Sequence, residues 1–232
     1  VPTLQVNVLG THHLLDAIRR EAPGCRTLVV TSAMIYRAGQ NALTEDAPLV
    51  PADPYGLSKL AQDQRARLAA TEDGLDVVVA RPFNHIGPGQ DPSFAISSFA
   101  RQIALIERGA APPVLRVGNL DAERDLTDVR DVVEAYQRLL EGGVTGAAYN
   151  VCSGRAWRIG DLLDQLLAQT PAAITTEADP ARLRPSDIPR LLGSHARITR
   201  ELGWQPRRPI AQTLAETLAW WRAELDAGRG AV

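Results

Sequence analysis

The sequence predicts an α/β fold built on a doubly wound parallel sheet. Short runs of β-branched and apolar residues alternate along the chain with segments of helical periodicity. Each run is continuously apolar, which is typical of a strand that helices cover on both faces. The order strand, helix, strand, helix, strand is that of βαβ units.

These patterns place the individual elements in order. Apolar residues recur at helical spacing over about 6–20 and predict a helix there. The continuous apolar runs predict strands at Thr27–Thr31, Asp76–Ala80 and Ala148–Val151. Between the strands we expect helices over about 54–70 and 129–141, the first opened by a Pro and the second stopped by two glycines.

Two longer segments interrupt this alternation. Residues 83–127 are rich in Gly, Pro and Asn and contain one helical pattern, near Ser97–Arg108. Residues 155–209 contain a helix at Ile159–Leu167, a strand near 174–176 and a loop rich in Arg and Pro. Ligands of open α/β sheets bind beyond the carboxyl ends of the strands. Since both segments follow strand ends, we expect them to form a smaller α/β lid over a crevice there.

Composition argues against several classes of function. The 232 residues include 25 Lys and Arg against 27 Asp and Glu, so no basic excess predicts nucleic acid or an anionic membrane as a partner. No stretch approaches the ~20 consecutive apolar residues of a membrane span. Cys25 and Cys152 are too few for a disulfide framework, and no His or Cys cluster has metal-ligand spacing. We therefore expect a cytoplasmic protein with no metal site.

Tyr55 and Lys59 form the most informative pair of residues. Four residues apart on a helix, they share a face, so the ammonium group lies near the phenol. A nearby cation lowers the pKa of a tyrosine from its usual ~10 and makes the phenol a usable proton donor. An ordinary pair on a helix surface has the same spacing, so the spacing alone leaves both interpretations open.

Further motifs surround this pair. Ser32 follows the first strand, four residues before Tyr36, and Arg81–Gly89 (RPFNHIGPG) follows the second. Together with Tyr55-x-x-x-Lys59 and the helix start Asn7–Thr11 (NVLGT), they resemble the extended short-chain dehydrogenases/reductases. This is a family of nucleotide-sugar epimerases, dehydratases and reductases. The resemblance covers essentially the whole chain and implies a Rossmann-like sheet.

Three stretches resemble the GDP-mannose branch of that family: Arg81–Gln90, Val117–Asp125, and Leu183–Pro189 followed by Leu202–Pro206. The 4,6-dehydratases of this branch carry a Glu two positions after the active Ser or Thr, where it removes a substrate proton. This chain has Met34 there, and a thioether cannot act as that base. The resemblance therefore implies the reductase reaction, in which the 4-keto group of GDP-4-keto-6-deoxy-D-mannose is reduced to give GDP-D-rhamnose.

The resemblance implies roles for individual residues. The implied catalytic residues are Ser32, Tyr55 and Lys59, with the two hydroxyls on the substrate's keto oxygen. Implied contacts of the cofactor, NADP or NAD, are Tyr55, Lys59, Pro82 and His85. Implied substrate contacts are Ser32, Asn84, Arg101, Asn119, Arg124, Arg184 and Asp187. Each of these arginines has an alternative interpretation as a solvated charge or a salt-bridge partner.

The resemblance also implies how the chain is divided and assembled. The remaining part of a dinucleotide-binding domain is expected over 1–92 and 128–153. A part that binds the nucleotide sugar is expected over 93–127 and 154–232. The helices at about 5–20 and 54–70 are implied to pair two subunits into a homodimer.

One feature of the family is absent, because no Gly-x-x-Gly-x-x-Gly turn follows a strand. A βαβ unit takes about 30 residues, so we expect an N-terminal portion with the pyrophosphate cradle to be missing. The chain should then bind the dinucleotide poorly and expose Thr27–Thr31 as an apolar sheet edge. Three alternatives to the reductase stay open: a GDP-mannose 4,6-dehydratase, a nucleotide-sugar 4-epimerase and a non-catalytic protein that binds nucleotide sugars.

Overall fold

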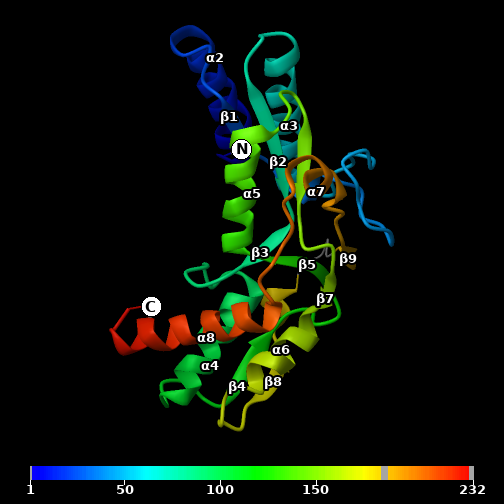
Figure 1. Ribbon diagram of the computed structural model, residues 1–232. Coiled ribbons are helices and arrows are strands. Elements are labelled where there is room, and N and C mark those ends of the chain that lie inside the picture. Colours follow the sequence, from blue (N-terminus) through cyan, green and yellow to red (C-terminus); the bar gives the residue numbers. More distant parts are fainter. Residues whose placement is uncertain (1, 184–187, 230–232) are drawn as a thin grey trace.

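The three predicted strands form one parallel sheet. In the computed structural model, which describes residues 2–183 and 188–229, they pair in the order β1-β2-β6 (Figure 1). Their bounds are Thr27–Val30 for β1, Val77–Pro82 for β2 and Ala148–Val151 for β6. Both pairings are parallel. The predicted α/β class and the parallel sheet are therefore confirmed.

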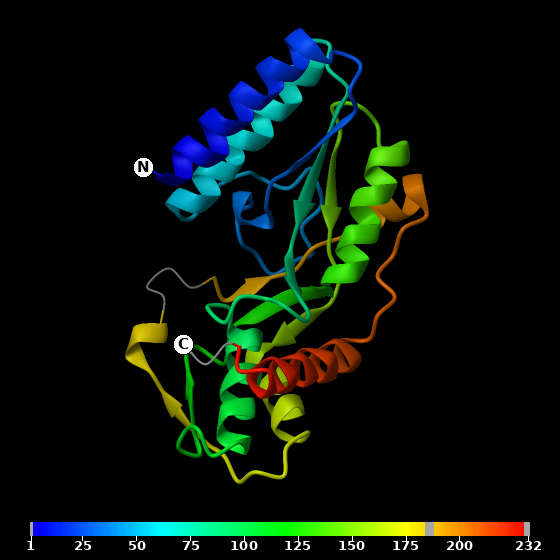
Figure 2. The ribbon, with the colours of Figure 1, turned by 90° about the vertical axis from the view of Figure 1, so that its left-hand side faces the viewer.

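Helices cover both faces of this sheet, as the continuous apolar runs predicted. They are α2 (Thr11–Glu21), α3 (Pro54–Thr71) and α5 (Val129–Gly142). Val77 and Val79 of β2 pack on the side of α2 and α3, whereas Val78 and Ala80 pack on the side of α5. Successive strand side chains point to opposite faces of a sheet. Since helices cover both faces here, every residue of β2 is buried. Figure 2 shows α2 and α3 side by side, with α5 across the sheet from them.

β1 is the outer strand of this sheet in the described part of the chain, where β2 is its one partner. Of its four residues only Val29 is buried. The edge position expected for this strand is confirmed within the described residues, but the segment is not fully exposed, because Thr27, Leu28 and Val30 are half-buried and Thr31 is buried. An open edge presents unpaired N–H and C=O groups that can pair with another strand.

The predicted N-terminal helix contains a wider turn. α1 (Pro2–Leu4), the π-helical turn η1 (Gln5–Gly10) and α2 follow one another without a break. Within the π-turn, the side-chain amide of Asn7 donates a hydrogen bond to the hydroxyl of Ser58 in α3 at 3.0 Å. The helix is confirmed, but its hydrophobic periodicity gave no sign of the π-turn.

The two interrupting segments form a second α/β layer, which lies below the first sheet in Figure 2. β5 pairs with β3, β7 and β9, and β4 pairs with β8. The strands are β3 (Asn84–Ile86), β4 (Val114–Val117), β5 (Glu123–Asp128), β7 (Ala156–Arg158), β8 (Thr175–Ala178) and β9 (Arg190–Leu191). The short turn η2 (Ala33–Ile35) follows β1 and belongs to the first layer. The second layer contains the helices α4 (Ala95–Glu107), α6 (Ile159–Leu167) and α8 (Ile210–Asp226), with a short turn at η3 (Pro180–Arg182). A large apolar core joins the three helices.

The helices predicted near 97–108 and at 159–167 and the strand predicted near 174–176 are confirmed as α4, α6 and β8. The other strands of this layer were not predicted. β9 has two residues and β3 and β7 have three each, which is too short to show a periodicity. The division of the chain into two functional parts stays a prediction.

The chain returns to the first sheet before its last helix. α7 (Ala196–Leu202) packs against β6, and Trp204 behind it is fully buried. The indole N–H of Trp204 donates to the backbone carbonyl of Asp131 at 3.0 Å. α8 then crosses to the second layer (Figure 1), where Trp221 lies in the core. None of the described helices is both long and apolar enough to cross a membrane.

Candidate active site

One large cavity, of about 1120 Å³, opens at the carboxyl ends of β1 and β2. One wall comes from the first sheet and the start of α3, and the other comes from α4, η3 and the residues around β5. The predicted site residues that line it are Ser32, Tyr55, Lys59, Pro82, Asn84, His85, Asn119 and Arg124. The fold therefore brings residues from both parts of the chain to one surface.

Ser32 stands where β1 ends and the turn η2 begins. Its Oγ accepts a hydrogen bond from the backbone N–H of Met34 at 3.2 Å and so caps this turn. The hydroxyl hydrogen stays available to a bound molecule, because a hydroxyl accepts and donates at once. Met34 itself is half-buried and lines the same cavity.

The start of α3 lies directly against that turn. Asp53 caps the helix by accepting a hydrogen bond from the backbone N–H of Gly56 at 2.6 Å, and Pro54 occupies the first helical position. A Cβ on Gly56 would lie 2.4 Å from the backbone oxygen of Met34, so this approach requires glycine. The close contact fixes Tyr55 relative to the turn that follows β1.

Tyr55 and Lys59 lie on one face of α3, as their spacing predicted. The Lys59 ammonium is 6.0 Å from the centroid of the Tyr55 ring. Its Nζ donates to the backbone oxygen of Val30 at 3.1 Å and to the side chain of Gln62 at 2.8 Å. Of the three N–H donors of a lysine, one is then left for a ligand. Burial lowers the pKa of Lys59.

The turn after β2 forms another part of the wall. Pro82 ends β2, and Asn84 and His85 follow in β3. The Nδ1 of His85 lies 3.2 Å from the backbone oxygen of Phe83. The side-chain amide of Gln90 donates to the backbone oxygen of His85 at 2.8 Å. These contacts fix the backbone that presents Asn84 and His85 to the cavity.

Asn119 and Arg124 line the cavity from the second layer. The Oδ1 of Asn119 accepts from the backbone N–H of Asp121 at 2.9 Å, which holds the loop before β5. The guanidinium of Arg124 donates to the backbone oxygen of Glu123 at 2.9 Å. This arrangement places a cation and an amide opposite the Tyr55 wall.

Three predicted substrate contacts remain. Arg101 is not among the residues that line the cavity; its guanidinium lies 5.8 Å from the centroid of the Trp221 ring. Arg184 and Asp187 lie outside the described residues. Among the described residues, no group of three His, Cys, Asp or Glu side chains could hold a metal ion.

Other residues line the cavity without having been predicted as site residues, among them Gln90, Tyr136 of α5 and Arg182 of η3. Burial raises the pKa of Tyr136 to about 12, and the neighbouring Tyr55 adds to the rise. Tyr136 therefore stays protonated at neutral pH. The Arg-rich composition of the loop was a usable signal for Arg182, whereas the sequence around Tyr136 resembles any amphipathic helix.

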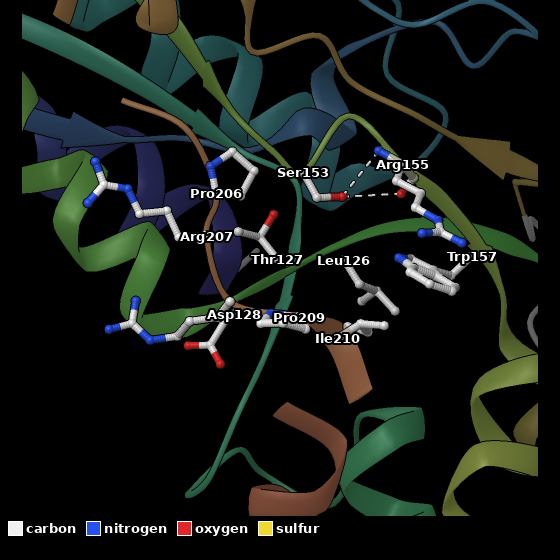
Figure 3. Close-up of a pocket in the computed structure, with 11 residues that line it drawn as sticks. Leu126, Thr127, Asp128, Ser153, Arg155, Trp157, Pro206, Arg207, Pro209 and Ile210 are labelled. Atoms are coloured by element: carbon white, nitrogen blue, oxygen red, sulfur yellow. Dashed lines mark hydrogen bonds between the residues drawn. The ribbon is translucent and has the colours of Figure 1, made fainter. Parts of the chain in front are cut away.

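A second, smaller pocket of about 220 Å³ lies at the carboxyl end of β5 (Figure 3). Among the described residues, only Leu126 lines both cavities. Figure 3 shows the Thr127 hydroxyl pointing between Pro206 and Ser153. None of the described residues of the predicted site lines this pocket.

Comparison with known proteins identifies the family. The family model described as GDP-mannose 4,6 dehydratase matches residues 1–217. The GDP-6-deoxy-D-mannose reductase of Pseudomonas aeruginosa is 41% identical over 226 residues, which are 96% of this chain and 74% of that protein. A dTDP-glucose 4,6-dehydratase of Streptomyces griseus is 32% identical over 94% of this chain and 65% of its own length. The chain belongs to the GDP-mannose 4,6-dehydratase family of extended short-chain dehydrogenases/reductases.

Solved structures agree with this assignment. The structure of RMD from Pseudomonas aeruginosa complexed with NADPH matches with a TM-score of 0.90 and 39% identity, over 95% of this chain and 74% of that one. A putative epimerase from Burkholderia cenocepacia matches with a TM-score of 0.81 and 34% identity, over 95% and 71%. The predicted resemblance and the predicted enzyme class, nucleotide-sugar oxidoreductases, are confirmed.

Proposed function

We propose that the protein is an NAD(P)H-dependent reductase that converts GDP-4-keto-6-deoxy-D-mannose into GDP-D-rhamnose. The observation that carries the proposal is that Ser32, Tyr55 and Lys59 line one cavity with Met34 beside them. The 41% identity to a GDP-6-deoxy-D-mannose reductase supports the choice of substrate.

The reaction adds a hydride to the carbonyl carbon and a proton to its oxygen. A bound reduced nicotinamide supplies the hydride. Ser32 donates its free hydroxyl hydrogen to the keto oxygen, and Tyr55 transfers its phenolic proton to that oxygen as negative charge develops. The Lys59 ammonium stabilises the phenolate that remains. Both donors act on charge that exists mainly in the transition state, where binding energy accelerates the reaction.

The donor set on this wall fits a dinucleotide. Lys59 keeps one N–H after its bonds to Val30 and Gln62, and a ribose hydroxyl is a suitable acceptor for it. Pro82 and His85 line the same cavity. One structural relative holds NADPH, and the dTDP-glucose 4,6-dehydratase of Streptomyces venezuelae, 27% identical, holds NAD. These relatives support NADP or NAD as the cofactor.

Asn84, Asn119 and Arg124 suit the nucleotide-sugar end of the cavity. A guanidinium grips the oxygens of a diphosphate bidentately, and amides pair with sugar hydroxyls. We therefore propose that Arg124 binds the diphosphate of the substrate. Arg101, Arg184 and Asp187 remain proposed contacts on the family resemblance alone.

The 4,6-dehydratase is the first alternative, and the cavity disfavours it. Elimination of water needs a base that removes a carbon-bound proton. Among the described residues that line the cavity, the one carboxylate is Asp53, which is engaged in capping α3. Met34 cannot ionise. A nucleotide-sugar 4-epimerase would use the same Ser32, Tyr55 and Lys59, but it would consume no reduced cofactor overall.

The proposal is tested by mixing the intact protein with the ketosugar and NADPH or NADH. Net loss of the reduced cofactor is expected from a reductase, whereas a 4-epimerase returns its hydride and a binding protein consumes nothing. Tyr55→Phe should lower kcat by about 10²–10⁴-fold, because it removes the proton donor. Tyr149→Phe removes the same atom from a tyrosine outside the cavity and should leave kcat unchanged. An unchanged cofactor absorbance beside an active control enzyme would refute the reductase.

We also propose that the protein is a cytoplasmic homodimer, paired through the helices at about 5–20 and 54–70. Support comes from the apolar side chains that these helices leave exposed, among them Leu9, Leu14, Leu57 and Leu68. An apolar surface of this kind is typical of a contact with another protein.

A further inference from the structure

A chain of hydrogen bonds leads from the C-terminal helix α8 to the wall of the large cavity. The indole N–H of Trp221 donates to the hydroxyl of Ser97 at 3.0 Å. That hydroxyl donates to the backbone oxygen of Gln90 at 2.5 Å. The side-chain amide of Gln90 donates in turn to the backbone oxygen of His85 at 2.8 Å. The Ser97 hydroxyl accepts one of these bonds and donates the next, so these two bonds strengthen each other.

This chain of hydrogen bonds through Trp221, Ser97, Gln90 and His85, called the relay below, begins outside the cavity and ends in its wall. Trp221 and Ser97 are buried and do not line the cavity, whereas Gln90 and His85 do. Trp221 and Ser97 therefore hold the backbone of Gln90 against α8, and the side chain of Gln90 is held by its own bond to the backbone of His85 in β3. A fixed side chain loses little conformational entropy when a ligand binds to it.

One atom of Gln90 takes no part in the relay. The backbone oxygen of His85 can only accept a hydrogen bond, so the NH₂ group of Gln90 must face it and Oε1 must point elsewhere. Oε1 is buried and has no hydrogen-bond partner among the described residues. A buried acceptor without a partner costs free energy. Gln90 lines the cavity, so a bound molecule can supply the missing donor.

We propose that Gln90 is a ligand-binding residue of the reductase site and that Trp221 and Ser97 are its positioning residues. Oε1 accepts a hydrogen bond from an N–H or O–H group of the bound molecule. The carboxamide of a nicotinamide and the hydroxyls of a sugar both offer such a donor. The inference rests on the proposed function for the identity of these ligands.

Titration of the intact protein with NADPH and, separately, with GDP-mannose as a stable nucleotide sugar tests the role of Gln90. Gln90→Met keeps the length of the side chain and removes its amide. The dissociation constant of one of the two ligands should rise about tenfold, since a lost hydrogen bond of this kind is a tenfold change in affinity. The ligand affected identifies the donor. Unchanged dissociation constants for both ligands would overturn the inference.

Trp221→Phe and Trp220→Phe form a matched pair that tests the relay. The two indoles are edge-to-face neighbours with centroids 4.8 Å apart, and the N–H of Trp221 is the one that donates to Ser97. Trp221→Phe should weaken the same ligand as Gln90→Met, by about threefold. Trp220→Phe should leave its affinity unchanged. Equal losses in both variants would overturn the positioning role. Binding is measured without turnover, so a parent protein that binds both ligands but reduces nothing would refute the proposed reductase and not this inference.

Discussion

The hydroxyl group of Ser32 can accept one hydrogen bond and donate another. Its oxygen accepts from the N–H of Met34, and this bond orients the side chain at the end of β1. Its hydrogen is not consumed by that contact, because a hydroxyl carries one donor besides its lone pairs. The turn η2 therefore prepares Ser32 as a donor for an oxygen that gains charge during the reaction.

Ser32→Ala should lower kcat about 10²-fold with little change in KM, because the lost hydrogen bond strengthens mainly in the transition state. Ser32→Thr keeps the hydroxyl and should retain most of the activity. Steady-state kinetics measure both variants, and their unfolding temperatures show whether the lost cap has disturbed the turn. A kcat of Ser32→Ala equal to that of the parent would contradict the role given to Ser32.

How far single residues could be predicted depended on the range of their contacts. The Tyr55 and Lys59 pair was predictable because helical spacing is a local property. The position of Arg101 was not, since its guanidinium lies over the ring of Trp221, far along the chain. Tyr136 reaches the cavity only because α5 packs across the sheet from α3. A local sequence pattern contains no information about such partners.

At the scale of elements, a buried ion pair ties α3 to β2. The guanidinium of Arg81 donates to the two carboxylate oxygens of Asp63 at 2.7 and 2.8 Å, and both side chains are fully buried. Arg81 also donates to the hydroxyl of Tyr36 at 2.9 Å. Burial raises the pKa of Tyr36 to about 12, so this tyrosine stays neutral. The pair fixes the helix that carries Tyr55 to the central strand.

Asp63→Ala should lower the free energy of unfolding by about 3–5 kcal/mol, because it leaves the charge of Arg81 buried without a counter-charge. The double variant Asp63→Leu/Arg81→Met buries no charge and should recover most of that loss. Urea denaturation of the parent, the single variant and the double variant measures the difference. If the double variant is no more stable than Asp63→Ala, the unpaired buried charge of Arg81 is not the cause of the loss.

A second ion pair joins α4 to α8. The guanidinium of Arg222 donates to the carboxylate of Glu107 at 2.8 and 2.6 Å. These hydrogen bonds hold the pKa of Glu107 below its ordinary value of 4.5. An acid whose pKa is lower in the folded protein stabilises the fold above its unfolded value, and this contribution disappears as the pH falls through the folded value.

Glu107→Gln should therefore destabilise the protein only where Glu107 is ionised. At neutral pH we expect a loss of about 0.5–1 kcal/mol in the free energy of unfolding, a small value because Arg222 is partly exposed to solvent. At a pH below the lowered pKa the difference from the parent should vanish. Urea denaturation at both pH values measures this difference. Asp226→Asn, which removes the exposed ion pair between Asp226 and Arg108, is the control. An equal loss at both pH values would exclude this ion pair as the cause.

Elements differed in predictability for a related reason. β1, β2 and β6 are mainly apolar runs, and the helices that cover both faces of the sheet explain their apolar residues. β5 contains Glu123, Arg124, Asp125 and Asp128, a composition typical of a loop. Its buried Asp125 is satisfied by backbone N–H groups of Ser153 and Gly193, which other segments supply. The charges of β5 become compatible with a strand only after the chain has folded.

At the scale of the whole molecule, α2 and α3 form a helical pair with apolar side chains on its outer surface. Leu14 of α2 is 57% exposed and Leu68 of α3 is 51% exposed. Leu57 precedes Leu68 by three helical turns and lies on the same face of α3. The inner faces of both helices are used against the sheet, so the outer residues have no role in the core of one chain. They fit the proposed contact with a second copy.

Leu68→Glu should convert the proposed homodimer into a monomer. A carboxylate buried in an apolar interface costs several kcal/mol unless it is paired, whereas on the surface of a monomer it costs little. Val133→Glu is the matched control, because Val133 is 60% exposed and lies on α5, across the sheet from the proposed interface. Sedimentation at micromolar concentration should give a dimer for the parent and for Val133→Glu and a monomer for Leu68→Glu, with similar unfolding temperatures for the two variants. A monomeric parent would refute the homodimer, and a Leu68→Glu variant that stays dimeric would exclude this face as the interface.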